Sequence, residues 1–256
     1  MEDQKPFRLR WPHYALAALV YFALLLAWAP ASLLAWALPR FTQQAVWLEQ
    51  PQGSVWNGRA AGLRVQVEGN TQQLGSLNWQ LRPLDLFAGR LGYRLQLAGA
   101  GIDATMTLRG GVAGGELREV RAELPASLLG KFSPDLALWQ PGGRLALQAQ
   151  RLAFGRGAVD GKATLRWRDA VSGRVNQPLG SYRAELEGTE RGLAIKLSTE
   201  AGALMLQGSG NWNPQRGVVF NGMARAVPAS RAQLDGLLGL IGPAQLDGSR
   251  AIRISH

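Results

Sequence analysis

Hydrophobic positions follow two patterns along the chain: one continuous run near the N-terminus and short alternating runs after it. The continuous run, residues 14–38, holds 25 residues without a formal charge. As a helix rising about 1.5 Å per residue it would reach roughly 37 Å, enough to cross a bilayer core of about 30 Å. The run predicts a transmembrane anchor at residues 13–38 and a cytoplasmic tail at residues 1–12. Pro30 is expected to kink or interrupt this helix.

Basic residues around the anchor set its expected orientation. Three precede it closely and one follows it, namely Lys5, Arg8, Arg10 and Arg40. The positive-inside rule then keeps the N-terminus in the cytoplasm and places the bulk of the chain on the other side of the membrane. A cleaved signal peptide is the alternative, because residues 29–31 and 35–37 fit a small-x-small cleavage pattern. The length of the apolar run favours a retained anchor, since a usual signal has an apolar region of only about 7–15 residues.

The remaining chain alternates between apolar and polar residues with a period of two, the pattern of half-buried β-strands. The alternating runs are residues 63–67, 93–97, 102–108, 145–147, 163–167, 182–186, 193–197 and 204–206. Turns containing glycine separate them, and 32 Gly with 13 Pro argue against an all-helical bundle. We therefore expect a mainly β fold: a single N-terminal transmembrane helix followed by an antiparallel, curved β-sheet domain with short helices. One face of the sheet should be apolar and the other solvated.

Two exported segments are expected to be helical, and both open with Pro-Ala-Ser, at residues 125–127 and 228–230. The order of landmarks around them also recurs, since Trp79 and Tyr93 precede the first tripeptide as Trp167 and Tyr182 precede the second. This order predicts two tandem exported β repeats, residues 39–140 and 141–256, with a seam at the glycine-rich residues 140–143. Chance similarity among strands rich in Leu, Arg and Gly is the alternative.

Side chains for enzyme chemistry are scarce. The chain has no cysteine, and its two histidines are His13 and His256, which argues against the usual triads and metal centres. Glutamates recur at residues 116–123 and 185–190 beside Arg or Lys, which is typical of a solvated face rather than of a glycosidase pair. We therefore predict no enzyme, with no catalytic, cofactor-binding or metal-binding residue, no cofactor and no small-molecule substrate.

The basic excess suggests acidic partners. Residues 41–256 hold 24 basic and 16 acidic residues, and 21 of the basic ones are arginine. Because this part of the chain is expected outside the cytoplasm, we predict no nucleic acid, and anionic lipid headgroups or an acidic protein fit the compartment better. Five exported tryptophans are expected to serve core or turn packing, with a stacking surface for carbohydrate or a partner as the alternative: Trp56, Trp79, Trp139, Trp167 and Trp212.

Two short motifs carry a resemblance to a known family. Residues 53–60 read Gly-Ser-Val-Trp-Asn-Gly-Arg-Ala, and residues 74–83 read Leu-Gly-Ser-Leu-Asn-Trp-Gln-Leu-Arg-Pro. Together with Gly89-Arg90-Leu91 they resemble the opening of the type II secretion system protein N family, and the resemblance extends over nearly the entire chain. It implies an accessory inner-membrane protein of a Gram-negative bacterium, within the apparatus that moves folded proteins across the outer membrane.

The leading hypothesis is a non-enzymatic, membrane-tethered component of this machine whose periplasmic β-rich domain binds other type II secretion proteins. A lipid-binding or lipid-transfer module at the inner membrane is the alternative, because the family also resembles anchored proteins whose strands form a lipid-lined trough. The two differ in whether the apolar sheet face is covered by helices or left open. A cell-wall hydrolase or sugar binder is a third hypothesis, resting on scattered Trp and acidic residues.

Overall fold

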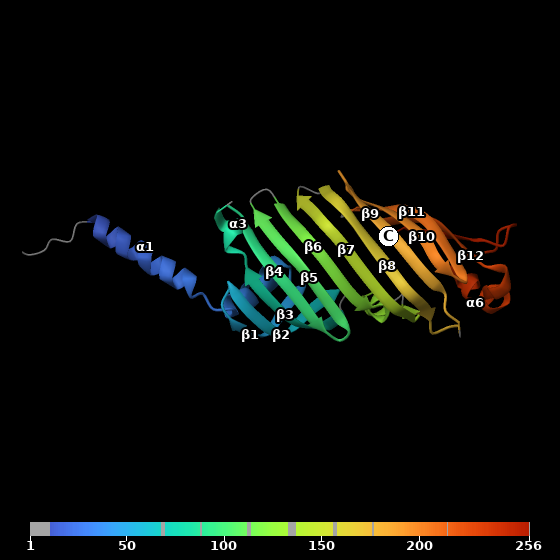
Figure 1. The fold of residues 1–256 in the computed structure, drawn as a ribbon, viewed down its shortest axis with the longest axis horizontal. Helices are drawn as coiled ribbons and strands as arrows, with labels where there is room; N and C mark the ends of the chain where they lie inside the picture. The colour runs from blue at the N-terminus through green and yellow to red at the C-terminus, as the bar shows by residue number, and fades with distance from the viewer. Residues whose placement is uncertain are drawn as a thin grey trace, which may run out of the picture.

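The protein is one antiparallel sheet of thirteen strands that lie side by side in chain order (Figure 1). The structure, a computed structural model, describes residues 11–67, 70–87, 89–111, 114–132, 137–155, 158–175, 177–213 and 215–255. Each strand pairs with the one before it, so the sheet is a continuous meander, twisted and curved along its length. The mainly β, antiparallel fold predicted from the alternation is confirmed.

The strands are between six and fifteen residues long. In the first half of the sheet they are β1 (Val46–Gly53), β2 (Asn57–Val67), β3 (Asn70–Leu81), β4 (Leu91–Gly99), β5 (Ile102–Gly111) and β6 (Gly114–Pro125). The second half comprises β7 (Pro141–Gly155), β8 (Ala158–Ser172), β9 (Gly180–Thr189), β10 (Gly192–Gly202), β11 (Leu204–Asn213), β12 (Gly217–Ala226) and β13 (Arg250–Ser255).

The apolar N-terminal run forms two helices, α1 (Trp11–Ala27) and α2 (Ser32–Phe41). Between them Pro30 makes an isolated bridge with Ser54, so the expected interruption at Pro30 is confirmed. Helix α1 extends away from the β1 end of the sheet (Figure 1), and the indole N–H of Trp56 donates to the Leu26 carbonyl at the end of this helix, 2.8 Å away. Within the described part of the chain, no helix combines the length and apolar character needed to cross a membrane.

The other helices are short and lie at strand ends. They are α3 (Pro83–Phe87), η1 (Ala126–Leu128), α4 (Leu129–Phe132), η2 (Pro228–Ser230) and α6 (Arg231–Ile241). Both Pro-Ala-Ser segments open helices as expected, although Pro125 is the last residue of β6 rather than part of the first turn. These helices follow β6 and β12, two strands that run in the same direction, so both lie on the side of the sheet where the carboxyl ends of these strands lie. Helix α4 also contacts β3, three strands away from β6, as the curvature of the sheet requires.

The predicted seam between repeats falls where β7 begins, at Pro141. The ladder from β6 to β7 is continuous across this point, with Leu124 paired to Leu145 and Val120 to Ala149. The two predicted units are therefore parts of one sheet, and their division at residues 140 and 141 stays a prediction.

Buried residues form three clusters along one face of the sheet. At the α2 end, Trp79 and Ala60 pack with Ala31, and at the other end Leu234 of α6 packs with Tyr182 and its neighbours. Tyr182 donates its hydroxyl to the Leu204 carbonyl at 2.9 Å, and burial raises the pKa of this phenol above its ordinary value. Helices thus complete the core at the two ends of the sheet.

Candidate functional site

The sheet has two chemically different faces, and the first is apolar on every strand. One cross-strand row of this face, followed through the register of all twelve ladders, holds no polar side chain. It consists of Pro51, Ala60, Leu77, Leu97, Ala104, Ala122, Leu147, Leu165, Ala184, Leu197, Gly208, Gly222 and Ile252. With neighbouring strands about 4.8 Å apart, twelve steps give this apolar row a length of roughly 58 Å.

The centre of the apolar face is a single layer. Its buried cluster, Val120, Ala149 and Ala163, packs against side chains that all belong to strands β5 to β9. The principal helix contacts are α2 with β1, α3 with β4, α4 with β3, η1 with β7 and α6 with β12 and β13, so only η1 meets a strand of this cluster. Leu147 and Leu165 in the apolar row accordingly remain only partly buried, and Phe154 on the same face is 41% exposed. The central apolar face is therefore open between the helices described.

Glycines on this face make room for aromatic rings across the ladder. Gly58 is paired with Trp79, and a Cβ at Gly58 would stand 2.5 Å from the Trp79 ring. Gly115 stands in the same relation to Phe154, with which it is paired. Each aromatic ring covers the backbone of the glycine opposite it, and such cross-strand pairs are known to stabilise strands that contain glycine. Trp79, packed over Gly58 and with Ala31 and Ala60, is 3% exposed.

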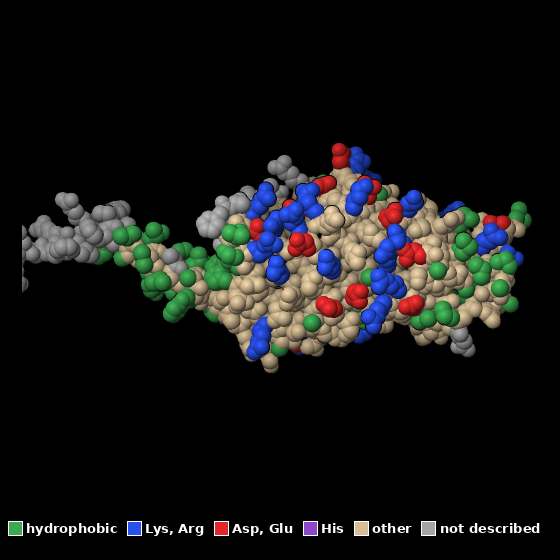
Figure 2. All heavy atoms as spheres, viewed as in Figure 1, with side chains coloured by type: hydrophobic (Ala, Val, Ile, Leu, Met, Phe, Trp, Pro, Cys, Tyr) green, Lys and Arg blue, Asp and Glu red, His purple; other side chains and the backbone are tan. Residues whose placement is uncertain are grey.

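The opposite face is polar along a parallel row, again one residue per strand. This polar row consists of Gln52, Arg59, Asn78, Gln96, Thr105, Arg121, Gln148, Thr164, Glu185, Lys196, Ser209, Asn221 and Arg253. Figure 2 shows basic and acidic side chains interspersed across this face, while hydrophobic ones gather on α1 and near α6. The face is thus charged but mixed in sign over most of its area.

Ion pairs account for several glutamates noted in the sequence. Glu116 lies 2.9 Å from Arg118 and 3.6 Å from Arg151 across the ladder, and Glu187 accepts from Lys162 at 2.7 Å. The hydrogen bond from Lys162 to Glu187 is the main reason that the pKa of this exposed amine lies above its ordinary value. These groups form the charge-balanced face that the sequence predicts.

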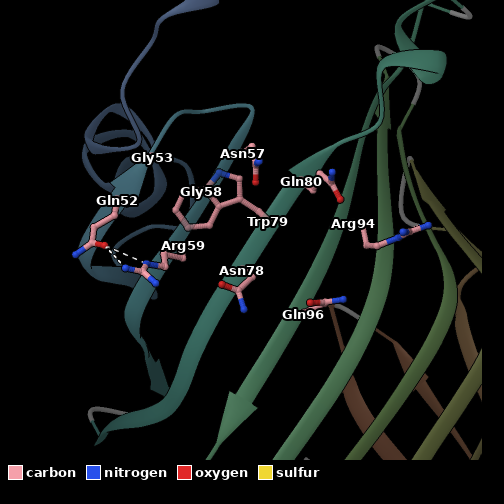
Figure 3. Close-up of a pocket in the computed structure, with 10 residues that line it drawn as sticks. All are labelled: Gln52, Gly53, Asn57, Gly58, Arg59, Asn78, Trp79, Gln80, Arg94 and Gln96. Atoms are coloured by element: carbon pink, nitrogen blue, oxygen red, sulfur yellow. Dashed lines mark hydrogen bonds between the residues drawn. The ribbon is translucent and has the colours of Figure 1, made fainter.

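The first four strands enclose a hollow of about 480 Å³ on the polar face. Figure 3 shows five amide side chains and two guanidinium groups around it. The polar members, all exposed, are Gln52, Asn57, Arg59, Asn78, Gln80, Arg94 and Gln96. We call this the amide hollow; no carboxylate is among its lining residues.

The two motifs that carry the family resemblance meet in the amide hollow. The ladder between β2 and β3 pairs Asn57 with Gln80 and Gly58 with Trp79, so Trp-Asn-Gly faces Asn-Trp-Gln directly. The indole N–H of Trp79 donates to the Ser54 carbonyl at 3.1 Å, which fixes the turn before β2. The sequence left open whether these motifs set strand ends or a partner surface. In the structure Trp79 is buried and holds the turn before β2, so its role is structural, whereas the amide side chains around it are exposed.

The other tryptophans also find packing or hydrogen-bonding positions. Trp167 donates its indole N–H to the Gly142 carbonyl at 2.9 Å and lies 5.8 Å from the ring of Tyr182. Trp139 packs against the cluster at the α6 end, and Trp212 is partly buried opposite Leu193. In the described ranges no group of three His, Asp or Glu side chains is placed to hold a metal ion. The predicted absence of site residues for catalysis, cofactors or metals remains a prediction.

These features define an open, two-faced β-sheet protein with a helical N-terminal extension. The chain belongs to the type II secretion system protein N family, whose model matches residues 44–253 and so covers the sheet from β1 into β13. No curated protein and no solved structure matches the chain. The resemblance noted in the sequence is therefore confirmed. The chain is a component of the type II secretion machinery at the cell envelope, and family membership implies contact with other components of the system.

Proposed function

We propose that this chain is a non-enzymatic inner-membrane component whose sheet lies in the periplasm and binds other proteins of the type II secretion machine. The observation that carries the proposal is the family match across the whole sheet, residues 44–253. A polar face of mixed charge that extends over thirteen strands offers the kind of surface that transient protein contacts use. This face supports binding as the role of the sheet.

The N-terminal helices have features that support the proposed membrane anchor. Large apolar side chains of α1 such as Leu19, Tyr21 and Phe22 are about two-thirds exposed, so the protein itself does not cover them. At the far end of α2 the guanidinium of Arg40 lies 3.8 Å from the ring centroid of Trp36. Such an aromatic and cationic pair is favoured at the headgroup level of a bilayer. We propose residues 13–38 as a retained anchor with its N-terminus in the cytoplasm, in which α1 enters the bilayer while α2, docked on β1, lies at the bilayer surface.

A single experiment tests orientation and partner binding together. The full chain, carrying alkaline phosphatase at its C-terminus, is produced in actively secreting cells and crosslinked before purification. We expect an active reporter, because the enzyme folds only outside the cytoplasm, and recovery of inner- or outer-membrane proteins of the secretion system. An inactive reporter would refute the orientation, and purification without any such protein would refute the binding role.

A lipid-binding role is the second candidate, and the open apolar face favours it. The apolar row runs roughly 58 Å without a polar side chain, and its central cluster is made of strand residues alone. Water contact with the partly exposed members of this row, such as Leu147 and Leu165, costs about 25 cal/mol for each Å² that a ligand could cover. Acyl chains laid along the row would remove that contact, and the nearby anchor would provide access to a bilayer.

Photo-crosslinking distinguishes the lipid role from a purely protein-binding role. Cells producing the full chain are fed a fatty acid that carries a diazirine, and adducts are mapped by mass spectrometry after irradiation. On the lipid hypothesis adducts appear on strand peptides around Leu147 and Leu165. The double variant Leu147→Gln, Leu165→Gln should lose them, whereas Gln148→Ala, Thr164→Ala on the polar row of the same two strands should keep them. Adducts confined to α1 and α2 would count against lipid on the sheet.

A further inference from the structure

Among the residues that the structure describes, the amide hollow combines unpaired positive charge with exposed amides in a concave surface whose lining holds no carboxylate. Several guanidinium groups elsewhere along that face meet carboxylates, as Arg109 meets Asp85 at 3.0 Å and Arg183 and Arg166 meet Glu200. Among the described residues neither Arg59 nor Arg94 forms an ion pair with a carboxylate. The local excess of charge is therefore +2, and it faces solvent.

Arg59 is held in place by a neutral partner. Its Nε and Nη2 atoms both donate to the Oε1 atom of Gln52, at 3.0 and 2.8 Å (Figure 3). An amide oxygen orients the guanidinium without cancelling its charge, so the remaining N–H groups stay available to a carboxylate in the planar geometry that arginine prefers. The arrangement orders a cation and leaves it without a counter-charge.

A second hollow continues the first across the sheet. It has a volume of about 450 Å³ and shares Arg94 and Gln96 with the amide hollow. Thr105, Thr107 and Arg121 line the continuation, together with one carboxylate, Glu119. The joined surface runs from β1 to β6 with three arginines and one glutamate. Five strand spacings of about 4.8 Å make it roughly 24 Å long, which is the length of about seven residues of extended polypeptide.

We infer that this joined hollow binds an extended acidic segment of another protein. Side-chain amides carry a donor and an acceptor in one plane, which suits the alternating N–H and C=O groups of an extended main chain. The arginines would pair with carboxylates of the segment, so the charge complements an acidic partner. The buried ring of Trp79, 3% exposed, gives a sugar nothing to stack upon, and this favours polypeptide over an anionic glycan. The inference rests on the proposed role in binding machine proteins and assigns that role a site.

Equilibrium binding measurements test whether the joined hollow prefers an acidic peptide. The full chain in detergent is titrated into a fluorescein-labelled peptide of alternating Glu and Ser, with Gln-Ser and Lys-Ser peptides and an oligogalacturonate as comparisons. We expect binding of the acidic peptide that weakens as salt rises, because exposed charges are screened. The double variant Arg59→Gln, Arg94→Gln should bind about tenfold more weakly, since each exposed ion pair contributes modestly. Unchanged melting of the variant would confirm that the sheet is intact.

The double variant Arg191→Gln, Arg216→Gln is the matched control, because it also removes two exposed arginines, from the β9–β10 and β11–β12 turns in the other half of the sheet. This variant should bind the acidic peptide as the parent does. Equal weakening by the control variant would mean that net charge alone attracts the peptide and would overturn the site. Tighter binding of oligogalacturonate than of the acidic peptide would overturn the assignment to polypeptide.

A crosslink in secreting cells separates this inference from the wider proposal. A photoreactive amino acid replaces Gln80 in the amide hollow or, as control, Ser209 in the polar row of β11. We expect adducts from the Gln80 position alone, joined to an acidic segment of a secretion protein identified by mass spectrometry. If machine proteins co-purify with the chain but no adduct forms at position 80, the site is wrong and the proposed function stands. If nothing co-purifies, the proposed function fails.

Discussion

Replacing Trp79 with alanine is expected to lower the free energy of unfolding by about 3–5 kcal/mol, as for other buried tryptophans truncated in a core. The ring is 3% exposed, lies against Gly58 and joins β2 and β3 to the α2 end through Ala31 and Ala60. Urea denaturation of the full chain, followed by far-UV circular dichroism, measures the change. A Trp79→Ala protein as stable as its parent would contradict a structural role for the Asn-Trp-Gln motif.

Trp79→Phe separates the ring from its hydrogen bond. Phenylalanine retains most of the apolar area but removes the N–H that donates to the Ser54 carbonyl at 3.1 Å. The cost should fall to about 1–3 kcal/mol, the range for leaving a buried acceptor without its donor. A loss as large as that of Trp79→Ala would assign the whole effect to the hydrogen bond and to the turn before β2.

Leu234→Ala is expected to produce the second large loss, about 2–5 kcal/mol of unfolding free energy. Leu234 is 0% exposed on α6, where it recurs with Leu237 and Leu238 at helical spacing and packs on the end of the sheet. Leu240→Ala on the same helix is the control, because Leu240 is 57% exposed and its truncation should change stability by no more than about 0.5 kcal/mol. Equal effects from the two variants would show that α6 is not docked as described.

Strands that hold an uninterrupted alternating run were predictable even where a bulge interrupts another part of the strand, as in β8, and strands without such a run were not. In β6 the bulge at Glu119, with φ of 52°, adds a residue, so Leu117 and Val120 reach the same face although they are three apart in sequence. A search for alternation with a period of two therefore misses such a strand. In β12 the apolar positions include Gly222 beside Phe220, so glycine hides the pattern. Alternation also fails to reveal β1 and β3. Pro51 interrupts the pattern in β1, and Gly75, which has a positive φ, interrupts it in β3.

The candidate surfaces depended on register, which periodicity does not supply. Alternation along each run already predicted one apolar and one polar face. It could not say that Asn57 lies opposite Gln80, because shifting one strand by two residues preserves every face and changes every pair. The amide hollow exists only in the observed register. The break at Pro30, in contrast, followed from the missing N–H of one residue and needed no tertiary information.

Strict succession of the strands has a consequence for how the molecule is built. Because β2 pairs with β1 and each later strand pairs with its predecessor, every ladder joins two strands that are consecutive in the sequence. Contact order is low for so large a sheet, and loop-closure entropy stays small at every step. The sheet can therefore assemble while the polypeptide is still being delivered, because each new strand pairs with the exposed edge of the strand before it, starting near α2. The last strand, β13, pairs with β12 after η2 and α6, and closes the far end of the growing sheet.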